Sequence, residues 1–381
     1  MKLFFAPVVV VALFAIYGAQ ARAAGEWEIT PQSEAALAHG LDWLAQNQGP
    51  EGNWTSNDLG LVSMGALAFL ADGHTPGRGK YGHNVEQALN YVLSHAKPSG
   101  LLNIADPQRD MYNHGLSTFV LGQAYGMTND ARISSVLERS LKLIANTQCK
   151  DGGWDYRAGS QDHGHDLSLA VMQAKALRSA VDSGLEVSPE VIKLAIRDVR
   201  EHYSSRSGPQ ANEADQQREP GQFTYNKGGG GPSPAMAAAG VVCLQEFGQY
   251  DDWRIGKNMQ ILSAEIKQRI KPEAQVNHDG RSAFDSYTLY YIGQAMYQVG
   301  GDSWKDLYPR VRDNLIATQT RMPGDVHQDG VWHDTMRVGG VPGDLYATAV
   351  SCFVLAIPNR YLPILQEGKI KQYQSEKQDT K

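Results

Sequence analysis

The sequence is poor in cysteine and lacks a basic stretch. Only three of its 381 residues are cysteines, and an odd, small number argues against a disulfide framework. Cys243 and Cys352 stand inside apolar runs, where a thiol behaves as a small hydrophobic side chain. The 35 Lys and Arg residues are outnumbered by 41 Asp and Glu residues, which gives a formal charge of −6. This balance argues against nucleic acid as a partner.

Long apolar runs are also missing beyond the N-terminus. One such run, from Leu3 to Ile16, follows Lys2 and precedes the triplet Ala21-Arg22-Ala23. This order is typical of a secretory signal peptide, and the run is short for a membrane span. We therefore expect an exported protein, periplasmic or secreted, without a stable membrane span after cleavage. An anchor that is kept uncleaved is the alternative.

The predicted domain organisation follows from this processing. Residues 1–23 are expected to be the signal peptide, and residues 24–365 are expected to form a single domain. Residues 366–381 are polar and are expected to form a disordered tail.

Strand patterns are almost absent, and helical patterns recur instead in six pairs. The first member of each pair is amphipathic, and the second is apolar nearly all round, as in a helix buried on more than one side. Such repetition is typical of helical solenoids and closed helical rings. Because the last apolar helix could not serve as a polar end cap, we predict a closed all-α ring, an (α/α)6 toroid. The amphipathic members span residues 33–48, 83–96, 130–148, 189–204, 253–270 and 303–319, and the apolar members span 59–70, 113–126, 167–181, 234–247, 286–299 and 345–357.

Two connections within these pairs share the spacing Gln-x-x-x-Gly-x-Trp. The Gly permits a left-handed turn after the helix, the Gln amide can bond the turn, and the Trp ring can fold back over the helix end. None of these side chains is a good acid, base or nucleophile, so we interpret the motif as structural. Its residues are Gln48, Gly52 and Trp54 in the first pair and Gln148, Gly152 and Trp154 in the third, with a weaker, interrupted version at Gln319, Gly330 and Trp332 in the sixth.

This motif resembles the QW repeats of triterpene cyclases and of protein prenyltransferase β-subunits. The likeness is greatest to exported bacterial proteins that contain prenyltransferase and squalene oxidase repeats, and segments 111–127, 146–156 and 358–364 carry it. It implies six hairpins around a largely apolar cavity that holds isoprenoid chains. The catalytic motifs of these families are absent: no Asp-x-Asp-Asp occurs, and Tyr287 and Ala347 stand where the prenyltransferase zinc site has Cys and His. The resemblance therefore leaves open whether the protein is an enzyme.

Polar residues gather where the apolar helices begin, and parallel inner helices would bring them to one mouth of the ring. Asp is a preferred N-cap residue, so capping is the default role and catalysis is the alternative. Three of the apolar helices begin with an Asp-x-Tyr pattern, which would present tyrosine hydroxyls at the mouth. The candidate residues are Asp110, Tyr112, His114, Asp162, His163, His165, Asp166, Asp285, Tyr287, Asp344 and Tyr346.

Two of these groups invite specific chemistry. Two His and two Asp within residues 162–166 are ligand types that zinc accepts, so a divalent metal is a weak alternative there, and no other cofactor is expected. His114 follows Asp110 by one helical turn and could be a general base, or it could be bonded within a helix layer.

Three functions are compatible with these patterns. The first is binding of an apolar or isoprenoid-like ligand in a central cavity. The second is a carbohydrate-active α/α barrel, a glycosidase or lyase, which needs two carboxylates roughly 5–10 Å apart at the mouth. The third is a protein-interaction scaffold whose centre is filled by side chains. The carboxylates that could serve the second are Asp110, Asp166, Asp285 and Asp344.

Overall fold

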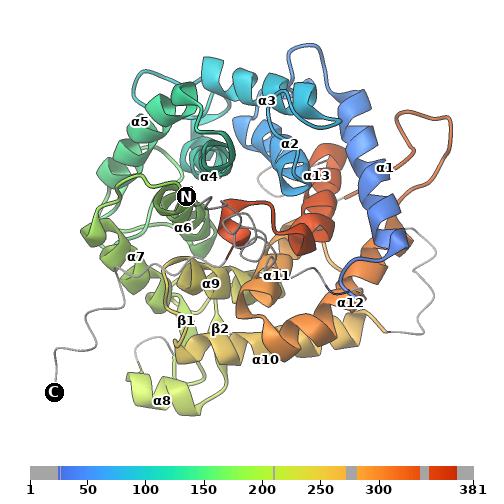
Figure 1. Cartoon of the computed structure of the whole chain (residues 1–381). Coiled ribbons are helices and arrows are strands. Elements are labelled where there is room, and N and C mark those ends of the chain that lie inside the picture. Colours follow the sequence, from blue (N-terminus) through green and yellow to red (C-terminus); the bar gives the residue numbers. More distant parts are fainter. Residues whose placement is uncertain (1–24, 26, 209–210, 272–280, 335–342, 367–381) are drawn as a thin grey trace, which may run out of the picture.

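The computed structural model describes residues 25, 27–208, 211–271, 281–334 and 343–366, so the predicted signal peptide and tail lie outside the described part. Its helices form two concentric rings (Figure 1). The outer ring consists of α1 (Pro31–Asn47), α3 (Gly82–Ser94), α5 (Ala131–Thr147), α7 (Pro189–Glu201), α10 (Trp253–Arg269) and α12 (Gly301–Thr318). The inner ring consists of α2 (Leu59–Ala71), α4 (Asp110–Thr128), α6 (Leu167–Asp182), α9 (Pro234–Glu246), α11 (Ser286–Val299) and α13 (Gly343–Ala356).

The inner ring is closed. Each inner helix contacts the next in the order α2, α4, α6, α9, α11, α13, and α13 contacts α2. In this order α4 lies opposite α11, and α6 lies opposite α13 (Figure 1). The prediction of an all-α (α/α)6 toroid is thereby confirmed. No helix of the described residues is both long and apolar enough to cross a membrane.

Small residues let the inner helices approach closely. A Cβ atom added at Gly122 of α4 would lie 2.2 Å from Ser179 Oγ of α6, and one added at Gly115 would lie 2.9 Å from Met172 Cβ. Side chains in these places would force the two helices apart. The alternation of glycine with larger apolar residues is therefore what lets α4 and α6 be buried on more than one side.

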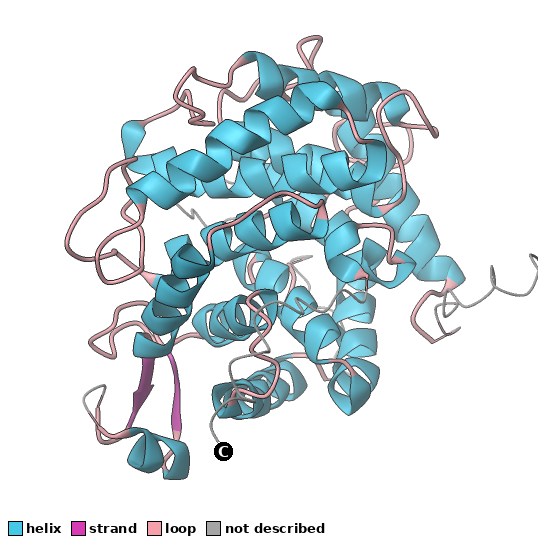
Figure 2. Ribbon diagram, turned by 60° about the vertical axis from the view of Figure 1, so that its left-hand side comes forward, coloured by secondary structure: helices cyan, strands magenta, loops and turns pink. Residues whose placement is uncertain are grey.

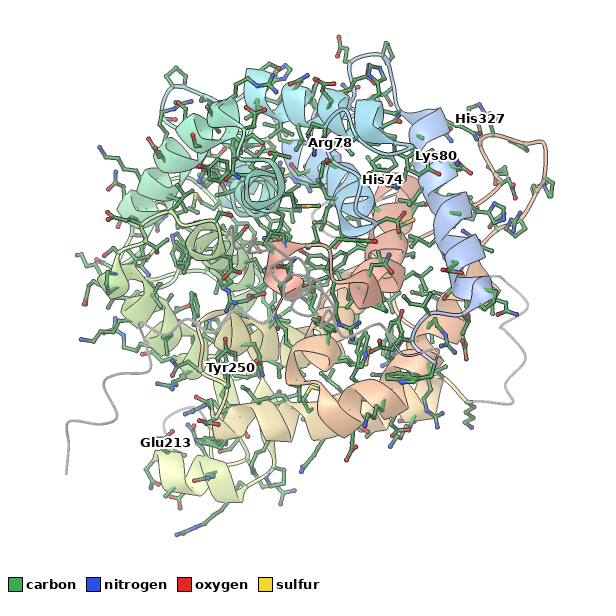
Figure 3. All side chains as sticks on the ribbon, in the orientation of Figure 1. His74, Arg78, Lys80, Glu213, Tyr250 and His327 are labelled. Atoms are coloured by element: carbon green, nitrogen blue, oxygen red, sulfur yellow. The ribbon has the colours of Figure 1, made fainter. Side chains whose placement is uncertain are left out.

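A small insertion between α7 and α9 was not predicted. Strands β1 (Tyr203–Ser205) and β2 (Gly221–Phe223) pair antiparallel and flank the short helix α8 (Glu213–Arg218). This insertion lies at the outside of the ring, where the indole Nε1 of Trp253 donates to Glu213 at 3.0 Å (Figures 2 and 3). Strands of three residues carry too little alternation to be recognised in a sequence.

The Gln–Gly–Trp motif joins neighbouring outer helices. Trp154 is buried, and its indole Nε1 donates to Ile144 O of α5 at 2.9 Å. The Gln148 amide donates to Gly152 O and to Val191 O of α7, both at 2.9 Å. Gly152 has φ +103°, and a Cβ atom there would lie 2.1 Å from Leu194 O. The turn therefore fixes the end of α5 against α7.

The first and sixth turns have the same construction. The indoles of Trp54 and Trp332 donate to carbonyls of α1 and α12, each at 2.8 Å. The Gln48 amide reaches Asn84 O of α3 at 3.0 Å, and the Gln319 amide reaches Ala36 O of α1 at 2.8 Å. The interrupted version of the motif in the sixth pair thus makes the same contacts as the two regular ones, and it connects the last outer helix to the first.

The chain's C-terminal segment closes one end of the inner ring. After α13, η2 (Ile357–Asn359) and η3 (Pro363–Leu365) cross the C-terminal ends of the inner helices (Figure 1). The Ile364 amide donates to Gln123 Oε1 of α4 at 3.0 Å, and the Tyr297 hydroxyl of α11 donates to Leu365 O at 2.6 Å. The N-terminal ends of the inner helices therefore form the mouth that this segment leaves uncovered.

The ring centre above this segment is filled by side chains rather than by an apolar cavity. Lys175 of α6 is 1% exposed, and its ammonium lies 3.3 Å from Glu246 Oε1 of α9 and bonds Gln294 of α11. It also lies 4.3 Å from the centre of the Phe119 ring of α4. Burial lowers the pKa of Lys175, while Glu246 opposes that shift. One charged side chain thus connects four inner helices.

We expect replacement of Trp154 to destabilise the fold. Trp154→Ala removes a buried indole and should lower the free energy of unfolding by about 3–5 kcal/mol. Trp154→Phe keeps most of the packing and loses the bond to Ile144 O, so it should lower this free energy by about 1 kcal/mol. Urea unfolding followed by circular dichroism measures both. Equal stabilities of the wild type and the Ala variant would contradict the structural role of the motif.

We expect the Lys175–Glu246 pair to behave as a unit. Lys175→Met leaves Glu246 buried without its cation and should lower the free energy of unfolding by about 3–5 kcal/mol. The double variant Lys175→Met/Glu246→Leu should recover most of that loss because no buried charge is left unpaired. Urea unfolding of the two single variants and the double variant forms the test, and additive losses would show that the two side chains are independent.

Candidate functional site

Aspartates cap several inner helices at the open mouth. Asp58 accepts from Leu61 N at 3.1 Å, and Asp285 accepts from the Thr288 amide and hydroxyl at 2.8 and 2.7 Å. Both oxygens of Asp285 are therefore used by its own helix. Asp285 is therefore unsuited to act as the nucleophile or acid that a glycosidase or lyase would need.

Asp110 and Asp344 depart from the expected capping role. The N-cap of α4 is Arg109, without a side-chain bond to the helix, and Asp110 is the first helical residue. Its carboxylate accepts from Asn103 Nδ2 at 2.8 Å and from Ala158 N at 3.4 Å. Asp344 lies in the first turn of α13, 42% exposed, 2.9 Å from His333 Nδ1. The two carboxylates are therefore held by the loops that surround the mouth.

Asp166 is the centre of the densest polar network at the mouth. Its Oδ1 accepts from the amides of Ser168 and Leu169 at 2.9 and 3.3 Å and thereby caps α6. Its Oδ2 accepts from the Tyr156 hydroxyl at 2.7 Å and lies 2.9 Å from His165 Nδ1. A capping carboxylate that is completely buried thus also orients a histidine.

His165 is presented to solvent by this network. Its side chain is 52% exposed although its Nδ1 lies beside a fully buried carboxylate. The ring packs edge-on against Tyr156, with 4.6 Å between ring centres. In the neutral ring, a proton on Nδ1 leaves Nε2 as an acceptor on a half-exposed side chain. This geometry suits a general base.

The second layer of this network comes from a distant part of the chain. Tyr225 follows β2, and its hydroxyl lies 2.5 Å from the Tyr156 hydroxyl. Its carbonyl accepts from Leu167 N at 3.1 Å, at the start of α6. Burial and the nearby Asp166 charge raise the pKa of Tyr156 and of Tyr225. Both hydroxyls therefore stay protonated and can donate at ordinary pH.

A lysine fixes the glycine-rich loop that follows Tyr225. Lys227 Nζ lies 2.5 Å from Asp198, 2.7 Å from Asp151 and 3.3 Å from Glu201. Asp151 also accepts from the Gly164 amide at 2.9 Å. Lys227 and Asp151 therefore join three segments by charge and hydrogen bonds: the glycine-rich loop, the turn of the third helix pair and the segment before His165. Sequence reasoning did not find this cluster or Tyr156, Tyr225 and His333, because only the fold brings them together.

The cluster at residues 162–166 does not gather into a metal site. Asp162 is 71% exposed and lies 2.6 Å from Lys150, and His163 is 85% exposed and lies 3.5 Å from Asp151. These side chains point away from His165 and Asp166 toward separate partners. In the part of the chain that the structure describes, no group of three or more His, Cys, Asp or Glu side chains could hold a metal ion.

His114 does not reach the mouth. It is completely buried, its Nδ1 accepts from Leu102 N at 3.2 Å, and its Nε2 lies 3.1 Å from Ser140 O. Both ring nitrogens thus bond the backbone, and burial lowers its pKa to about 4. The interpretation as a general base beside Asp110 is wrong, because the ring ties the loop before α4 to α5.

The three candidate tyrosines turn toward the ring axis instead of the solvent. Tyr287 and Tyr346 are each 8% exposed, and the hydroxyl of Tyr112 is buried. Burial raises the pKa of all three. They form the layer between the mouth and Lys175.

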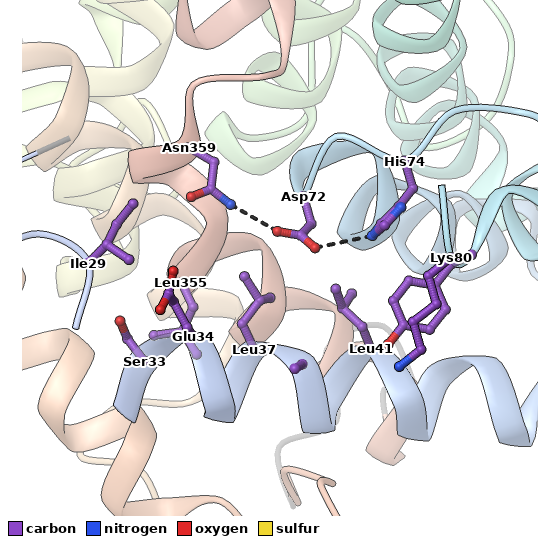
Figure 4. A pocket seen from close by; sticks show the side chains of 12 residues that line it. Ile29, Ser33, Glu34, Leu37, Leu41, Asp72, His74, Lys80, Leu355 and Asn359 are labelled. Carbon is purple, nitrogen blue, oxygen red and sulfur yellow. Dashed lines mark hydrogen bonds and ion pairs between the residues drawn. The ribbon is translucent and has the colours of Figure 1, made fainter. Parts of the chain in front are cut away.

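A cavity of about 280 Å³ lies at the opposite end of the ring. It opens between α1 and the C-terminal ends of α2 and α13 (Figure 4). Within it, Asp72 accepts from Asn359 Nδ2 at 2.9 Å and lies 3.2 Å from His74 Nε2. These contacts fix the closing C-terminal segment to α2, so they serve the fold at the end away from His165.

Several solved structures with a similar fold are enzymes that act on sugars. A cellobiose 2-epimerase from Bacillus thermoamylovorans matches with a TM-score of 0.57 at 12% identity, over 85% of this chain and 98% of its own. An inactive α-1,6-mannanase variant from Salegentibacter sp., in complex with α-1,6-mannotriose, matches with a TM-score of 0.54 at 10% identity, over 88% of this chain and 100% of its own. A D-mannose isomerase matches with a TM-score of 0.54 at 12% identity, over 86% and 98%. No family model and no curated protein matches the sequence.

These neighbours correct the predicted family and ligand. The expected membership of the prenyltransferase and squalene oxidase repeat proteins is wrong, since the neighbours are (α/α)6 barrels that act on sugars. The expected apolar or isoprenoid-like ligand is wrong for the same reason. The carbohydrate-active alternative is better supported than the apolar-ligand hypothesis.

The mannanase variant was inactivated by changing two adjacent aspartates to asparagine. The one adjacent pair of aspartates in this sequence is Asp251-Asp252. Asp252 caps the outer helix α10 and binds Arg200 at 2.9 Å and Arg254 at 3.1 Å. Asp252 is therefore structural.

We expect His114 to make the fold sensitive to acid. Its pKa is about 4 in the folded chain against about 6.5 unfolded, so the unfolded chain binds the proton more readily between these values. Stability should therefore fall as the pH drops from about 6.5 to about 4. Between pH 7 and 4 the wild type should lose about 3 kcal/mol more than His114→Gln, as measured by urea unfolding at each pH. Parallel pH profiles of the two proteins would contradict this expectation.

Proposed function

We propose that this protein is a carbohydrate-active enzyme whose active site is the mouth at the N-terminal ends of the inner helices. The observation that carries the proposal is His165, half exposed at that mouth and oriented through Nδ1 by the buried Asp166. The (α/α)6 fold, which the sugar epimerase, isomerase and mannanase neighbours share, supports it.

The arrangement favours proton transfer on a sugar over hydrolysis by paired carboxylates. Asp166 already accepts hydrogen bonds from its own helix and from the Tyr156 hydroxyl, and Asp285 accepts two from Thr288 of its own helix, which leaves neither free as a nucleophile. His165 can instead remove the proton from the carbon next to the carbonyl of an open-chain sugar. The electron pair of the broken C–H bond then forms the C=C bond of an enediol, and the carbonyl oxygen takes up a proton from water. One enediol hydroxyl then loses its proton to water as a C=O bond re-forms, and a protonated imidazole returns a proton to carbon, which completes an isomerisation or epimerisation.

A second imidazole is available across the mouth. His333 lies 2.9 Å from Asp344 at the start of α13, and α13 lies opposite α6 in the inner ring. Epimerisation needs removal of a proton from one face of the carbon and its return to the other. Two histidine–aspartate pairs on opposite sides suit this chemistry, with His165 as the base and His333 as the acid.

The third hypothesis, a protein-interaction scaffold, is favoured by one observation. The ring centre is filled by Lys175 and its partners, as that hypothesis required. A filled centre confines any substrate to the mouth, whereas a scaffold needs no substrate at all. A wild type without any action on sugars would leave this hypothesis as the better one.

We further propose that the protein is exported. The apolar run after Lys2 and the triplet Ala21-Arg22-Ala23 support this location. N-terminal sequencing of protein recovered from the host's medium or periplasm would find Ala24 first, whereas a cytoplasmic protein that keeps Met1 would refute it.

We expect the loss of His165 to abolish turnover. His165→Ala should lower kcat/KM about 10²–10⁴-fold on the sugar that the wild type converts, because the base is lost. His163→Ala is the matched control, since it is a histidine two residues away that points to Asp151 and should leave activity unchanged. Glucose, mannose, cellobiose and α-1,6-mannotriose form the panel, and NMR in D₂O detects exchange of the proton at C2. Turnover that is unaffected by His165→Ala would refute the assigned base.

A further inference from the structure

Directly below the mouth, tyrosines from opposite inner helices meet at the ring axis. Tyr287 and Tyr291 of α11 are perpendicular, with 4.9 Å between their ring centres, and Tyr290 lies 5.2 Å from Tyr291. Tyr112 of α4 approaches from the other side, close enough that its hydroxyl and those of Tyr287 and Tyr291 affect one another's pKa. The layer is thus built by two helices, α4 and α11, that lie opposite each other in the ring.

The hydroxyls of this layer lack the partners that other tyrosines have. The hydroxyls of Tyr112, Tyr290 and Tyr291 are buried. Their nearest polar neighbours are Tyr287 and Tyr291 for Tyr112 and Gln294 for Tyr290, but none of these contacts reaches hydrogen-bond geometry within the described structure. By contrast, Tyr297, on the same helix α11, donates to Leu365 O at 2.6 Å. A buried polar group without a partner destabilises a fold by about 1–3 kcal/mol, and native proteins keep few of them. Three at one place indicate that their partner is a bound molecule.

The chemistry of the layer restricts that molecule to an uncharged one with hydroxyl groups. Burial raises the pKa of Tyr112, Tyr290 and Tyr291, so each hydroxyl stays neutral and can both donate and accept. A hydroxyl group of a ligand also donates and accepts, which allows the two sets to pair fully. The nearest charges, Lys175 and Glu246, are already paired with each other, so an ion would lose its hydration without finding a free opposite charge.

We propose that the hydroxyls of Tyr112, Tyr290 and Tyr291 form the floor of a sugar-binding site and bond the hydroxyl groups at the innermost end of the ligand. This inference rests on the proposed function for the position of the mouth. It adds that the recognition below His165 is made by neutral hydroxyls rather than by carboxylates.

The test compares single Tyr→Phe changes on α4 and α11. Tyr291→Phe and Tyr112→Phe should weaken binding of glucose and mannose about tenfold, the loss of one hydrogen bond to the ligand. Neither variant should lower the melting temperature of the ligand-free protein, because no intramolecular bond is lost. Tyr297→Phe is the matched control: it should lower the melting temperature and leave affinity unchanged, since its hydroxyl holds the closing segment. Calorimetric titration and thermal unfolding measure both quantities.

The sugar-binding inference and the proposed enzyme function would fail with different experimental results. Variants that bind both sugars like the wild type would overturn the inference and show that the hydroxyls are paired by enclosed water or by nothing, and His165-dependent turnover would still support the proposed function. Hydroxyl-dependent binding without any turnover would support the sugar site and refute the enzyme. A wild type that binds neither sugar would overturn the inference, and turnover on the larger panel would then decide the proposed function by itself.

Discussion

Burial of the inner helices on two sides is the constraint on which the rest of the structure depends. A helix in this position can expose its unpaired amides and carbonyls only at its ends. Polar residues therefore collect at the two ends of the ring, where aspartates such as Asp58, Asp166 and Asp285 cap the N-termini. The amphipathic outer helices cover the inner ring, and the tryptophan turns fix each outer helix to the next one. Closure of the ring follows when the sixth turn binds Ala36 O of the first helix.

The two ends of the ring are not equivalent, and this asymmetry supports the proposed position of the active site. The last residues of the domain lie across the C-terminal ends of the inner helices and are held there by Gln123, Tyr297 and Asp72. The other end keeps a histidine in solvent beside a buried carboxylate. Helix N-termini also carry partial positive charge, which favours oxygen-rich ligands over cations. Structural closure at one end and polar chemistry at the other are thus two consequences of the same helix direction.

The sequence was sufficient for the architecture because periodicity and capping are local. The six pairs, the closed ring and the role of Trp154 all follow from spacing within about twenty residues. The same locality explains why the family resemblance was misleading. Gln, Gly and Trp in the turn solve a problem that any ring of helical hairpins has, namely how to end one outer helix against the next, as Gln148 does with Val191 O. Such a motif reports the architecture and is silent on the ligand.

His165 and Asp166 could be named from the sequence, but the side chains that hold them could not, because those partners are far apart in the chain. Tyr225 joins Asp166 through Tyr156, and Lys175 meets Gln294 across more than one hundred residues. The centre that these contacts create also argues against an isoprenoid ligand. A hydrocarbon chain placed on the axis would have to displace a buried Lys–Glu pair and leave both charges without partners, which is strongly unfavourable. It would also cover three tyrosine hydroxyls that it cannot bond. A hydroxyl-rich ligand held at the mouth meets neither obstacle, so the interior of the ring supports the class of substrate that we propose.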